Sequence, residues 1–513
     1  MDGIDAVTVA KHAAQAGVEL RPGEDAVLAE LVADVGSMID LFDQLPAAEP
    51  VASGVRDPGR APSRDEDPLN AVIRRISVRR RSGGRLAGRR VGVKDTIAVA
   101  GVPMTAGSIV LADFVPERDA TVVERLLDEG AELVAKLNMD GFAWSGGADT
   151  GDYGKILNPA DLAYSTCGSS GGTAAALAYE WVDLTLGTDQ AGSNRLPASW
   201  CGVLGMKPTF GLVPYTGVMS VDPTIDHVGP MATNVSDLAL LLDVIAGRDA
   251  DDPRQARTPD LAPDAFCAAV EDTPATLAGV RIGVLQEGFS SILGVPQEVT
   301  TAIKEVAQHF RKLGADVVEV SVPEHPVGGP LAFAFYCESQ LNVLTSGGNG
   351  YGWSGRYATD LPVALGKALA AASVDLPITL KTVLVAGMML RERANGAYYA
   401  RAQNLRPWLR AGYDRALRTV DALLLPTSTV PPQPHVDETD VVARTRRGWS
   451  MLGNTPGTDI TGHPAVSIPA AQIDGLPVGA MLIGRHFDDA GLLRLARAYE
   501  RDIGWQLCPP QSW

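Results

Sequence analysis

The chain has 513 residues, of which 46% are hydrophobic and 20% charged, and these proportions exclude an intrinsically disordered protein. Its formal net charge of −17 repels phosphate backbones, so we expect no nucleic-acid partner. No segment approaches the ~18 charge-free apolar residues of a membrane span, and the N-terminal residues lack the apolar region of a signal peptide. We therefore expect a cytoplasmic protein without a membrane partner.

The five cysteines are scattered, odd in number and never spaced as Cys-x-x-Cys. This pattern favours a reducing compartment and argues against a disulfide framework or a zinc site. The five are Cys167, Cys201, Cys267, Cys337 and Cys508.

The N-terminal residues 1–70 are predicted to form a small helical module followed by a linker. Apolar residues recur at helical spacing over residues 5–45. Residues 50–68 lose this pattern and are rich in proline, glycine and serine, as linkers are. We therefore assign residues 71–513 to the main body. Two roles are open for the module: dimerisation, which would make the protein a homodimer, or coverage of one face of the main body.

Two similar stretches predict buried strands. Residues 86–95 (Leu-Ala-Gly-Arg-Arg-Val-Gly-Val-Lys-Asp) are echoed by residues 277–285 (Leu-Ala-Gly-Val-Arg-Ile-Gly-Val-Leu), and Lys94 stands at the position of Leu285. Burial penalises an ammonium ion and lowers the pKa of a lysine, so Lys94 is a candidate general base. The alternatives are that Lys94 reaches water or pairs with an acid. Asp95 is a poor partner because it points to the opposite face of the strand.

Helix and strand alternate along the main body. Two units each contain a helix, a glycine that ends it and an apolar strand, and three further apolar segments precede a final helix. This alternation predicts an α/β fold with a sheet covered by helices on both faces. The expected helices are residues 119–129, 297–313 and 489–501, and the expected strands are residues 131–136, 316–322, 421–427, 461–469 and 475–484.

Two serine-bearing, glycine-rich loops flank an apolar segment, residues 174–186, that can cross the protein interior. The loops are residues 167–173 (Cys-Gly-Ser-Ser-Gly-Gly-Thr) and residues 187–195 (Gly-Thr-Asp-Gln-Ala-Gly-Ser-Asn-Arg). Successive backbone N–H groups in such loops form a concavity for an anion, and they stabilise an oxyanion if a serine attacks a carbonyl. The alternative is a pair of tight surface turns.

Taken together, these motifs resemble the amidase signature family over most of the chain from about Leu86 onward. The resemblance implies the amidase-signature fold, with a mixed central β-sheet covered by helices on both faces, and it implies neither a cofactor nor a metal. Residues 211–217 and the Asp-Gln pair after Thr188 look most similar to the enantioselective amidases associated with nitrile hydratases. The family motifs also include residues 205–209 (Gly-Met-Lys-Pro-Thr), 226–230 (Asp-His-Val-Gly-Pro) and 461–464 (Thr-Gly-His-Pro).

The resemblance implies a Ser–cisSer–Lys triad. Ser193 would be the nucleophile, Ser169 the bridging serine at a cis peptide bond, and Lys94 the base. The implied reaction is the hydrolysis of a small-molecule carboxylic amide, or of a related acyl–nitrogen bond, through an acyl-enzyme. His463, which precedes a proline at a strand entrance, is expected to be structural rather than catalytic.

The resemblance also implies an oxyanion hole and a substrate pocket. Ala191 stands where the family usually has glycine, and we expect strain if this position requires a positive φ. We expect the pocket to be lined by the loop from Ala143 to Gly147 and by a less regular region, about residues 250–447. The implied oxyanion donors are the backbone N–H groups of Gln190, Ala191, Gly192 and Ser193. The candidate pocket aromatics, for which ordinary core is the alternative, are Phe333, Phe335, Tyr336 and Trp353.

The motifs leave other functions open. The chain could be an amidotransferase or acyltransferase component that works with a partner protein, or a catalytically silent family member. Residues 350–355 match a dinucleotide-binding fingerprint by letter, but we expect neither a strand before them nor a helix after them, so no nucleotide cofactor is predicted.

Overall fold

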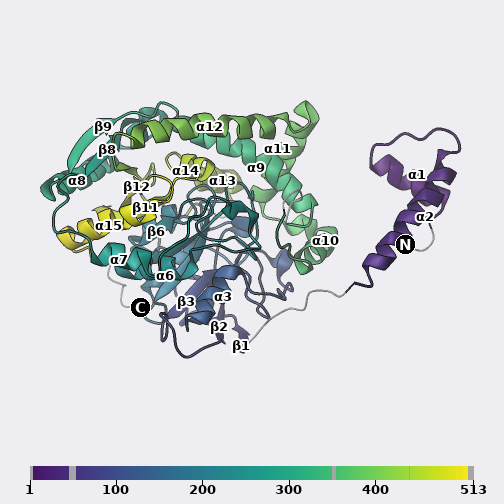
Figure 1. The fold of residues 1–513 in the computed structure, drawn as a ribbon, viewed down its shortest axis with the longest axis horizontal. Coiled ribbons are helices and arrows are strands. Elements are labelled where there is room, and N and C mark those ends of the chain that lie inside the picture. Colours follow the sequence, from purple (N-terminus) through teal and green to yellow (C-terminus); the bar gives the residue numbers. More distant parts are fainter. Residues whose placement is uncertain (1–3, 46–53, 349–353, 438, 506–513) are drawn as a thin grey trace. The chain divides into compact units, whose positions relative to one another are not determined.

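The computed structural model describes residues 4–45, 54–348, 354–437 and 439–505 (Figure 1). The chain divides into two compact units, Met1–Val51 and Ala52–Trp513, each of which is described by itself. Among the described residues, Cys167, Cys201, Cys267 and Cys337 form no disulfide bond, whereas Cys508 lies outside these residues.

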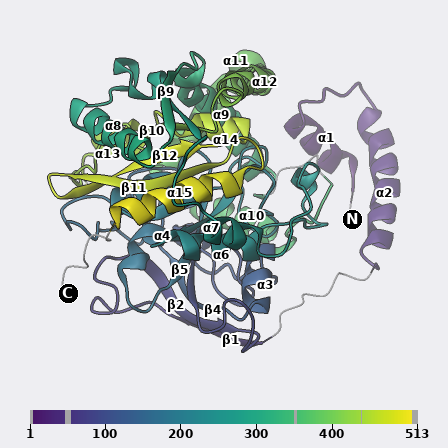
Figure 2. The same ribbon diagram turned by 60° about the vertical axis from the view of Figure 1, so that its left-hand side comes forward.

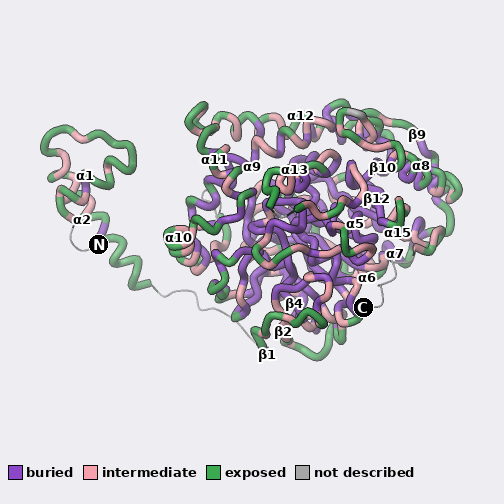
Figure 3. Tube along the Cα trace, turned by 180° about the vertical axis from the view of Figure 1, so that it is seen from behind, coloured by how far each residue is buried: buried purple, intermediate pink, exposed green. Residues whose placement is uncertain are grey.

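The first unit contains two helices, α1 (Ala6–Gln15) and α2 (Glu24–Phe42), as the helical spacing predicts. The side chain of Asp5 caps α1 by accepting a hydrogen bond from the Thr8 amide at 2.7 Å. Most of the apolar residues on these helices are exposed. Figure 3 shows the two helices mainly in green and pink, the colours of exposed and intermediate residues.

The second unit is built on one mixed sheet, with strand order β1-β2-β4-β3-β5-β7-β6-β11-β12-β10-β8-β9. Strand β3 is parallel to both β4 and β5, β8 is parallel to both β9 and β10, and the remaining neighbours are antiparallel. The described strands are β1 (Val55–Arg60), β2 (Val72–Arg79), β3 (Arg90–Lys94), β4 (Glu132–Leu137), β5 (Leu184–Asp189), β6 (Leu204–Lys207), β7 (His227–Ala232), β8 (Arg281–Leu285), β9 (Asp316–Val320), β10 (Ala422–Pro426), β11 (Ala465–Ile473) and β12 (Leu476–Ile483).

Helices cover both faces of this sheet, as predicted. On one face, α3, α6, α7, α8 and α15 share a single apolar cluster with the strands, and Figures 1 and 2 both show α15 beside α7. On the other face, α9 to α12 and α14 form a second cluster. The described helices of this unit are α3 (Thr121–Asp128), α4 (Gly171–Ala175), α5 (Arg195–Cys201), α6 (Val235–Ile245), α7 (Ala265–Glu271), α8 (Gln297–Lys312), α9 (Gly328–Thr345), α10 (Asp360–Ala372), α11 (Ile378–Ala394), α12 (Ala397–Leu417), α13 (Val441–Ser450), α14 (Pro456–Thr461) and α15 (Asp489–Ile503).

The sheet includes residues that the sequence assigned to a linker. The prediction of a linker over residues 50–68 is wrong for β1, which pairs with β2 as an edge strand. The sequence did not predict this strand, because the adjacent Pro58 and Gly59 are typical of turns. An edge strand tolerates both residues: the register shifts between Asp57 and Arg60, and Gly59 takes a φ of 66°.

The region of residues 250–447 is largely helical rather than irregular. Its longest elements are α9, α11 and α12. Helix α9 buries seven consecutive residues, 335–341, so this stretch is enclosed on all sides and lacks the one-sided apolar spacing that predicts a surface helix. Residues 349–353 lie outside the described residues, so most of the rejected fingerprint at 350–355 is not tested.

No single helix among the described residues has the length and apolar content needed to cross a membrane. A pair bent by 106°, Asp360–Asp375 with Ile378–Ala394, passes together by length and composition.

Candidate active site

The two serine-bearing loops lie next to each other in the second unit, one before α4 and the other between β5 and α5. Ser169 lies just before Ser170, the N-cap of α4, and follows a cis peptide bond from Gly168, as the family resemblance implied. Ser193 lies between β5 and α5, and its carbonyl oxygen accepts a hydrogen bond from the Ser170 amide at 3.3 Å. This backbone bond holds the two loops side by side, so the interpretation of both as surface turns is excluded.

Lys94 ends β3 with its side chain fully buried. Its Nζ donates hydrogen bonds to Ser169 Oγ at 2.7 Å and to Thr188 Oγ1 at 2.9 Å. Burial lowers the pKa of Lys94 to about 7, although Asp140 and Asp189 oppose this shift through their charges. A large fraction of the amine is therefore neutral near pH 7, with hydroxyl groups as its hydrogen-bond partners.

Asp95 faces away from Lys94, as predicted, and binds a second buried lysine. Asp95 Oδ1 lies 3.1 Å from Nζ of Lys136, and its Oδ2 accepts hydrogen bonds from the amide and hydroxyl of Thr105. Lys136 is thus buried with a carboxylate partner, whereas Lys94 is buried against hydroxyl groups. No sequence pattern indicated this difference, because Lys136 and Asp95 belong to separate strands and loops.

Gly168 lies against the carboxylate of Asp140. A Cβ atom at Gly168 would stand 1.9 Å from Asp140 Oδ2, so any larger residue here must displace that carboxylate. Asp140 also accepts hydrogen bonds from the amides of Ala148, Asp149 and Thr150 at 2.9–3.1 Å. It therefore organises the end of the pocket loop and the loop of Ser169 together.

The loop before Ser193 is held by Asp189. Its Oδ1 accepts a hydrogen bond from the Gly192 amide at 2.5 Å, and its Oδ2 accepts one from the Asn194 amide at 3.3 Å. The Gly192 N–H is therefore not available to a substrate oxyanion in this arrangement, which corrects its implied role. Among the described residues, no group accepts a hydrogen bond from the amides of Gln190, Ala191 or Ser193, which remain the candidate donors.

Ala191 does not carry the strain that a positive φ would cause. The positive φ of the loop, 118°, belongs to the next residue, Gly192, where a Cβ atom would stand 2.3 Å from Thr455 Oγ1. The substitution of alanine for the usual glycine therefore leaves the backbone of this loop unstrained.

Arg195 stabilises the same loop through ion pairs with two aspartates. It is fully buried; its Nε lies 2.9 Å from Asp189 Oδ2 and its Nη2 lies 2.7 Å from Asp459 Oδ2. This guanidinium lowers the pKa of the Asp189 carboxyl against the opposing effect of burial, so Asp189 stays ionised. Local spacing along the chain offered no signal for Asp459, which lies on α14.

We expect Arg195→Met to destabilise the protein by about 3–5 kcal/mol, because two buried carboxylates lose the cation between them. Urea unfolding monitored by circular dichroism measures this change. The matched control is Arg401→Met at an exposed position of α12, which should change the free energy of unfolding by no more than about 0.5 kcal/mol. An equal effect of both substitutions would contradict a structural role for the buried ion pair.

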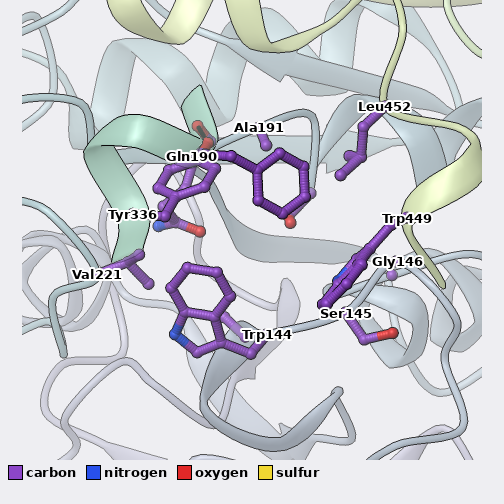
Figure 4. A pocket seen from close by; sticks show the side chains of 13 residues that line it. Trp144, Ser145, Gly146, Gln190, Ala191, Val221, Tyr336, Trp449 and Leu452 are labelled. Atoms are coloured by element: carbon purple, nitrogen blue, oxygen red, sulfur yellow. Dashed lines mark hydrogen bonds between the residues drawn. The ribbon is translucent and has the colours of Figure 1, made fainter. Parts of the chain in front are cut away.

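Ser193 is among the residues that line a pocket of about 470 Å³, a volume that includes the open mouth of the pocket (Figure 4). The ring centroids of Trp144 and Tyr336 lie 5.4 Å apart, those of Tyr336 and Phe333 6.3 Å, and those of Phe333 and Trp449 5.5 Å, each pair edge to face. The lining residues are Ala143, Trp144, Ser145, Gly146, Gly168, Gln190, Ala191, Ser193, Val221, Phe333, Tyr336, Trp449 and Leu452.

Most of the predicted pocket residues line it. The loop from Ala143 contributes as expected, with the Ala143 amide itself bound to the Asp140 carbonyl. Phe333 and Tyr336 line the pocket, whereas Phe335 is core and packs on Tyr399. Trp353 lies outside the described residues.

His463 has the structural environment that was expected. It is buried, with Nδ1 2.9 Å from Thr461 Oγ1 and Nε2 3.1 Å from Asp414 Oδ1. His486 joins it to form a group with metal-ligand spacing, but His486 Nε2 lies 3.0 Å from the Thr461 carbonyl oxygen. Hydrogen bonds thus account for this cluster, and none of its residues lines the pocket.

The chain belongs to the amidase family, whose family model, described as Amidase, matches residues 70–493. The fold and the serine–lysine geometry described above agree with this membership. The match begins within the second compact unit and covers nearly all of it.

Relatives with two kinds of name are almost equally similar to the chain. An enantioselective amidase of Rhodococcus rhodochrous is 37% identical over 88% of this chain and 86% of its own length. A glutamyl-tRNA(Gln) amidotransferase subunit of Chloroflexus aggregans is 36% identical over 86% of this chain and 88% of its own length. Among solved structures, peptide amidase from Stenotrophomonas maltophilia is 29% identical, with a TM-score of 0.69 over 83% of this chain and 85% of that chain.

Proposed function

We propose that this protein is an amidohydrolase that cleaves a small-molecule carboxylic amide, or a related acyl–nitrogen bond, to an acid and an amine or ammonia. The observation that carries the proposal is the 2.7 Å contact between the buried Lys94 amine and the Ser169 hydroxyl. Burial lowers the pKa of this amine to about 7, which suits a general base at neutral pH. The family membership supports the same class of reaction.

In the proposed mechanism, the two hydroxyl groups relay a proton to Lys94. The neutral amine accepts the proton of Ser169 while Ser169 Oγ accepts the proton of Ser193, and Ser193 Oγ forms a bond to the amide carbon. In this mechanism, the amides of Gln190, Ala191 and Ser193 donate hydrogen bonds to the resulting oxyanion. The C–N bond then breaks as the proton returns through Ser169 to the leaving nitrogen. Water hydrolyses the ester by the same relay.

A second candidate is an amidotransferase subunit that transfers nitrogen in complex with a partner protein. The 36% identity to the glutamyl-tRNA(Gln) amidotransferase subunit of Chloroflexus aggregans favours it. The net charge of −17 argues against direct contact with tRNA by this chain. The two functions differ in whether the purified chain turns over a free amide without a partner.

The test uses the full chain purified alone. We expect it to hydrolyse members of a panel of aliphatic, aryl and hydrazide amides, measured by mass spectrometry of the acid product. We also expect a fluorophosphonate to label Ser193 covalently, located by peptide mapping. Labelling of Ser193 without hydrolysis of any panel member would favour the amidotransferase function. The absence of both labelling and hydrolysis would favour a silent family member and overturn the proposal.

A further inference from the structure

Three side chains from separate elements meet outside the pocket. Asp414 lies near the end of α12, His463 stands two residues before β11, and His486 follows β12. The pairing of Ala465 with Ile483 brings the two histidines to the same end of these strands. One possible ligand atom from each of the three residues lies within 4.8 Å of the others. Two imidazoles and a carboxylate are a ligand set that suits zinc and neighbouring divalent metals, and it needs no cysteine.

His463 and Asp414 are already spaced as two ligands of one ion. The Nε2 atom of His463 lies 3.1 Å from Asp414 Oδ1. Zinc bonds of about 2.0–2.2 Å at a tetrahedral angle place two ligand atoms about 3.4 Å apart. An ion can therefore bind both atoms with only a small movement. Without an ion, the imidazole N–H donates to the carboxylate, so the ion takes the place of this proton.

Thr461 orients both rings through the nitrogen atoms that a metal would not use. Its carbonyl oxygen accepts a hydrogen bond from Nε2–H of His486 at 3.0 Å, which leaves the lone pair of Nδ1 on that ring. Its hydroxyl oxygen lies 2.9 Å from Nδ1 of His463 and accepts the proton of this atom when Nε2 binds a cation. Metal-binding histidines almost always donate their other ring N–H to an oxygen atom. The hydrogen bonds that account for this cluster therefore also prepare it for an ion.

The cluster also suits an ion in charge and in access. Burial lowers the pKa of both imidazoles, so both rings are neutral at pH 7, which is the form that binds metal ions. The Asp414 side chain is 43% exposed, so an ion with its water ligands can reach the site from solvent. The opposing positive charge is Arg410, whose Nη2 donates to the Thr461 carbonyl oxygen at 2.6 Å. The carboxylate of Asp414 offsets this charge.

We propose that Asp414, His463 and His486 form a binding site for one divalent transition-metal ion of the zinc type, with water completing its coordination. None of the three residues lines the pocket, so the proposal goes beyond the proposed hydrolase function and does not depend on it. The bound ion links α12 to the ends of β11 and β12. It stabilises the folded chain, because the unfolded chain does not hold the three ligands together.

The test adds Zn²⁺ to the full chain after a chelator has removed bound metal. We expect calorimetry to show one zinc ion per chain, and the Tm to rise with the zinc concentration and to fall again when EDTA is added. His486→Gln and Asp414→Asn each change one ligand on a partly exposed side chain, so the fold should persist, as circular dichroism can verify. Each substitution should raise the Kd for zinc by at least about tenfold.

His309→Gln is the matched control. His309 Nδ1 lies 2.8 Å from Asp502 Oδ2, but among the described residues no third ligand joins this pair. This variant should keep the wild-type Kd. An equal rise of the Kd in His309→Gln would show that zinc binds scattered surface histidines, and it would overturn the proposal.

Two further results would overturn the proposal: the absence of zinc binding by the wild type, and a wild-type Kd in either His486→Gln or Asp414→Asn. The amide panel tests the proposed function separately, so either of the two can fail without the other.

Discussion

Ser193→Ala is expected to lower kcat for amide hydrolysis by at least about 10⁴-fold. The reason is that Ser193, Ser169 and Lys94 act together in the proposed mechanism, so losing the nucleophile removes the contribution of all three. The fold should persist. The Ser193 carbonyl takes part in the contact between the two loops through the Ser170 amide, and alanine keeps this carbonyl. Steady-state kinetics measures the rate, and urea unfolding measures the stability.

Ser170→Ala is the matched control for this substitution. Ser170 lies in the neighbouring loop, and its hydroxyl donates to the Thr188 carbonyl at 3.1 Å rather than lining the pocket. We expect this variant to lose about 1 kcal/mol of stability and to retain most of its activity. Activity that survives in Ser193→Ala, or an equal loss in Ser170→Ala, would contradict the assignment of the nucleophile.

Lys94→Leu is expected to fold and to lose about 10³–10⁴-fold in kcat near pH 7. Leu285, at the equivalent position of β8, packs in the apolar cluster on one face of the sheet, so leucine suits this strand position. In the wild type, the rate should rise as the pH increases through about 7, where Lys94 loses its proton. The pH profile of kcat/KM measures this rise, and a profile that is flat from pH 5 to 9 would remove Lys94 from the mechanism.

The same lysine predicts how stability depends on pH. Its pKa is about 7 in the folded protein against an ordinary value of 10.5, so between these pH values the unfolded chain binds a proton that the folded chain does not. Wild-type stability therefore rises with pH in this window, and below pH 7 the full cost of burying the charge is present. The stability of Lys94→Leu relative to the wild type should fall by about 2 kcal/mol between pH 7 and pH 9.

Lys136→Leu provides a comparison, since Lys136 is equally buried and burial lowers its pKa as well, but the Asp95 carboxylate at 3.1 Å opposes that shift. Its loss leaves that carboxylate unpaired, so we expect a destabilisation of about 3–5 kcal/mol. Urea unfolding of both variants at pH 7 and pH 9 makes the comparison. If Lys94→Leu shows no dependence on pH relative to the wild type, the buried neutral amine is contradicted.

The features that could be predicted from the sequence are encoded within a few neighbouring residues. The echo between residues 86–95 and 277–285 predicted two strands with the same orientation: Val91 and Val93 lie in the same apolar cluster as Ile282 and Val284. Lys94 and Leu285 follow at the last position of each strand. Because side chains alternate across a strand, this pattern was sufficient to bury the amine and to turn Asp95 away from it.

Features that depend on distant residues could not be predicted in this way. Asp459 lies 264 residues after Arg195, and no local spacing connects them. The occupied amide of Gly192 also escaped prediction, because it follows from how the Asp189 carboxylate folds back on its own loop. Strand β1 and the buried part of helix α9 were also missed because their tertiary positions are not encoded locally. An edge strand tolerates proline and glycine, which otherwise indicate a turn. A helix segment that is buried on all sides lacks the one-sided apolar spacing that predicts an amphipathic helix.

The bond between Arg195 and Asp459 also has a consequence for biosynthesis. A ribosome completes the lysine and both serines of the proposed relay long before it reaches the second carboxylate that binds this guanidinium. The newly made chain therefore already contains Lys94, Ser169 and Ser193, but the loop that positions Ser193 still lacks the contact between Arg195 and Asp459. A nascent chain stalled before residue 455 should for this reason fail to react with a fluorophosphonate. Competence to react would then arrive only when the polypeptide is nearly finished.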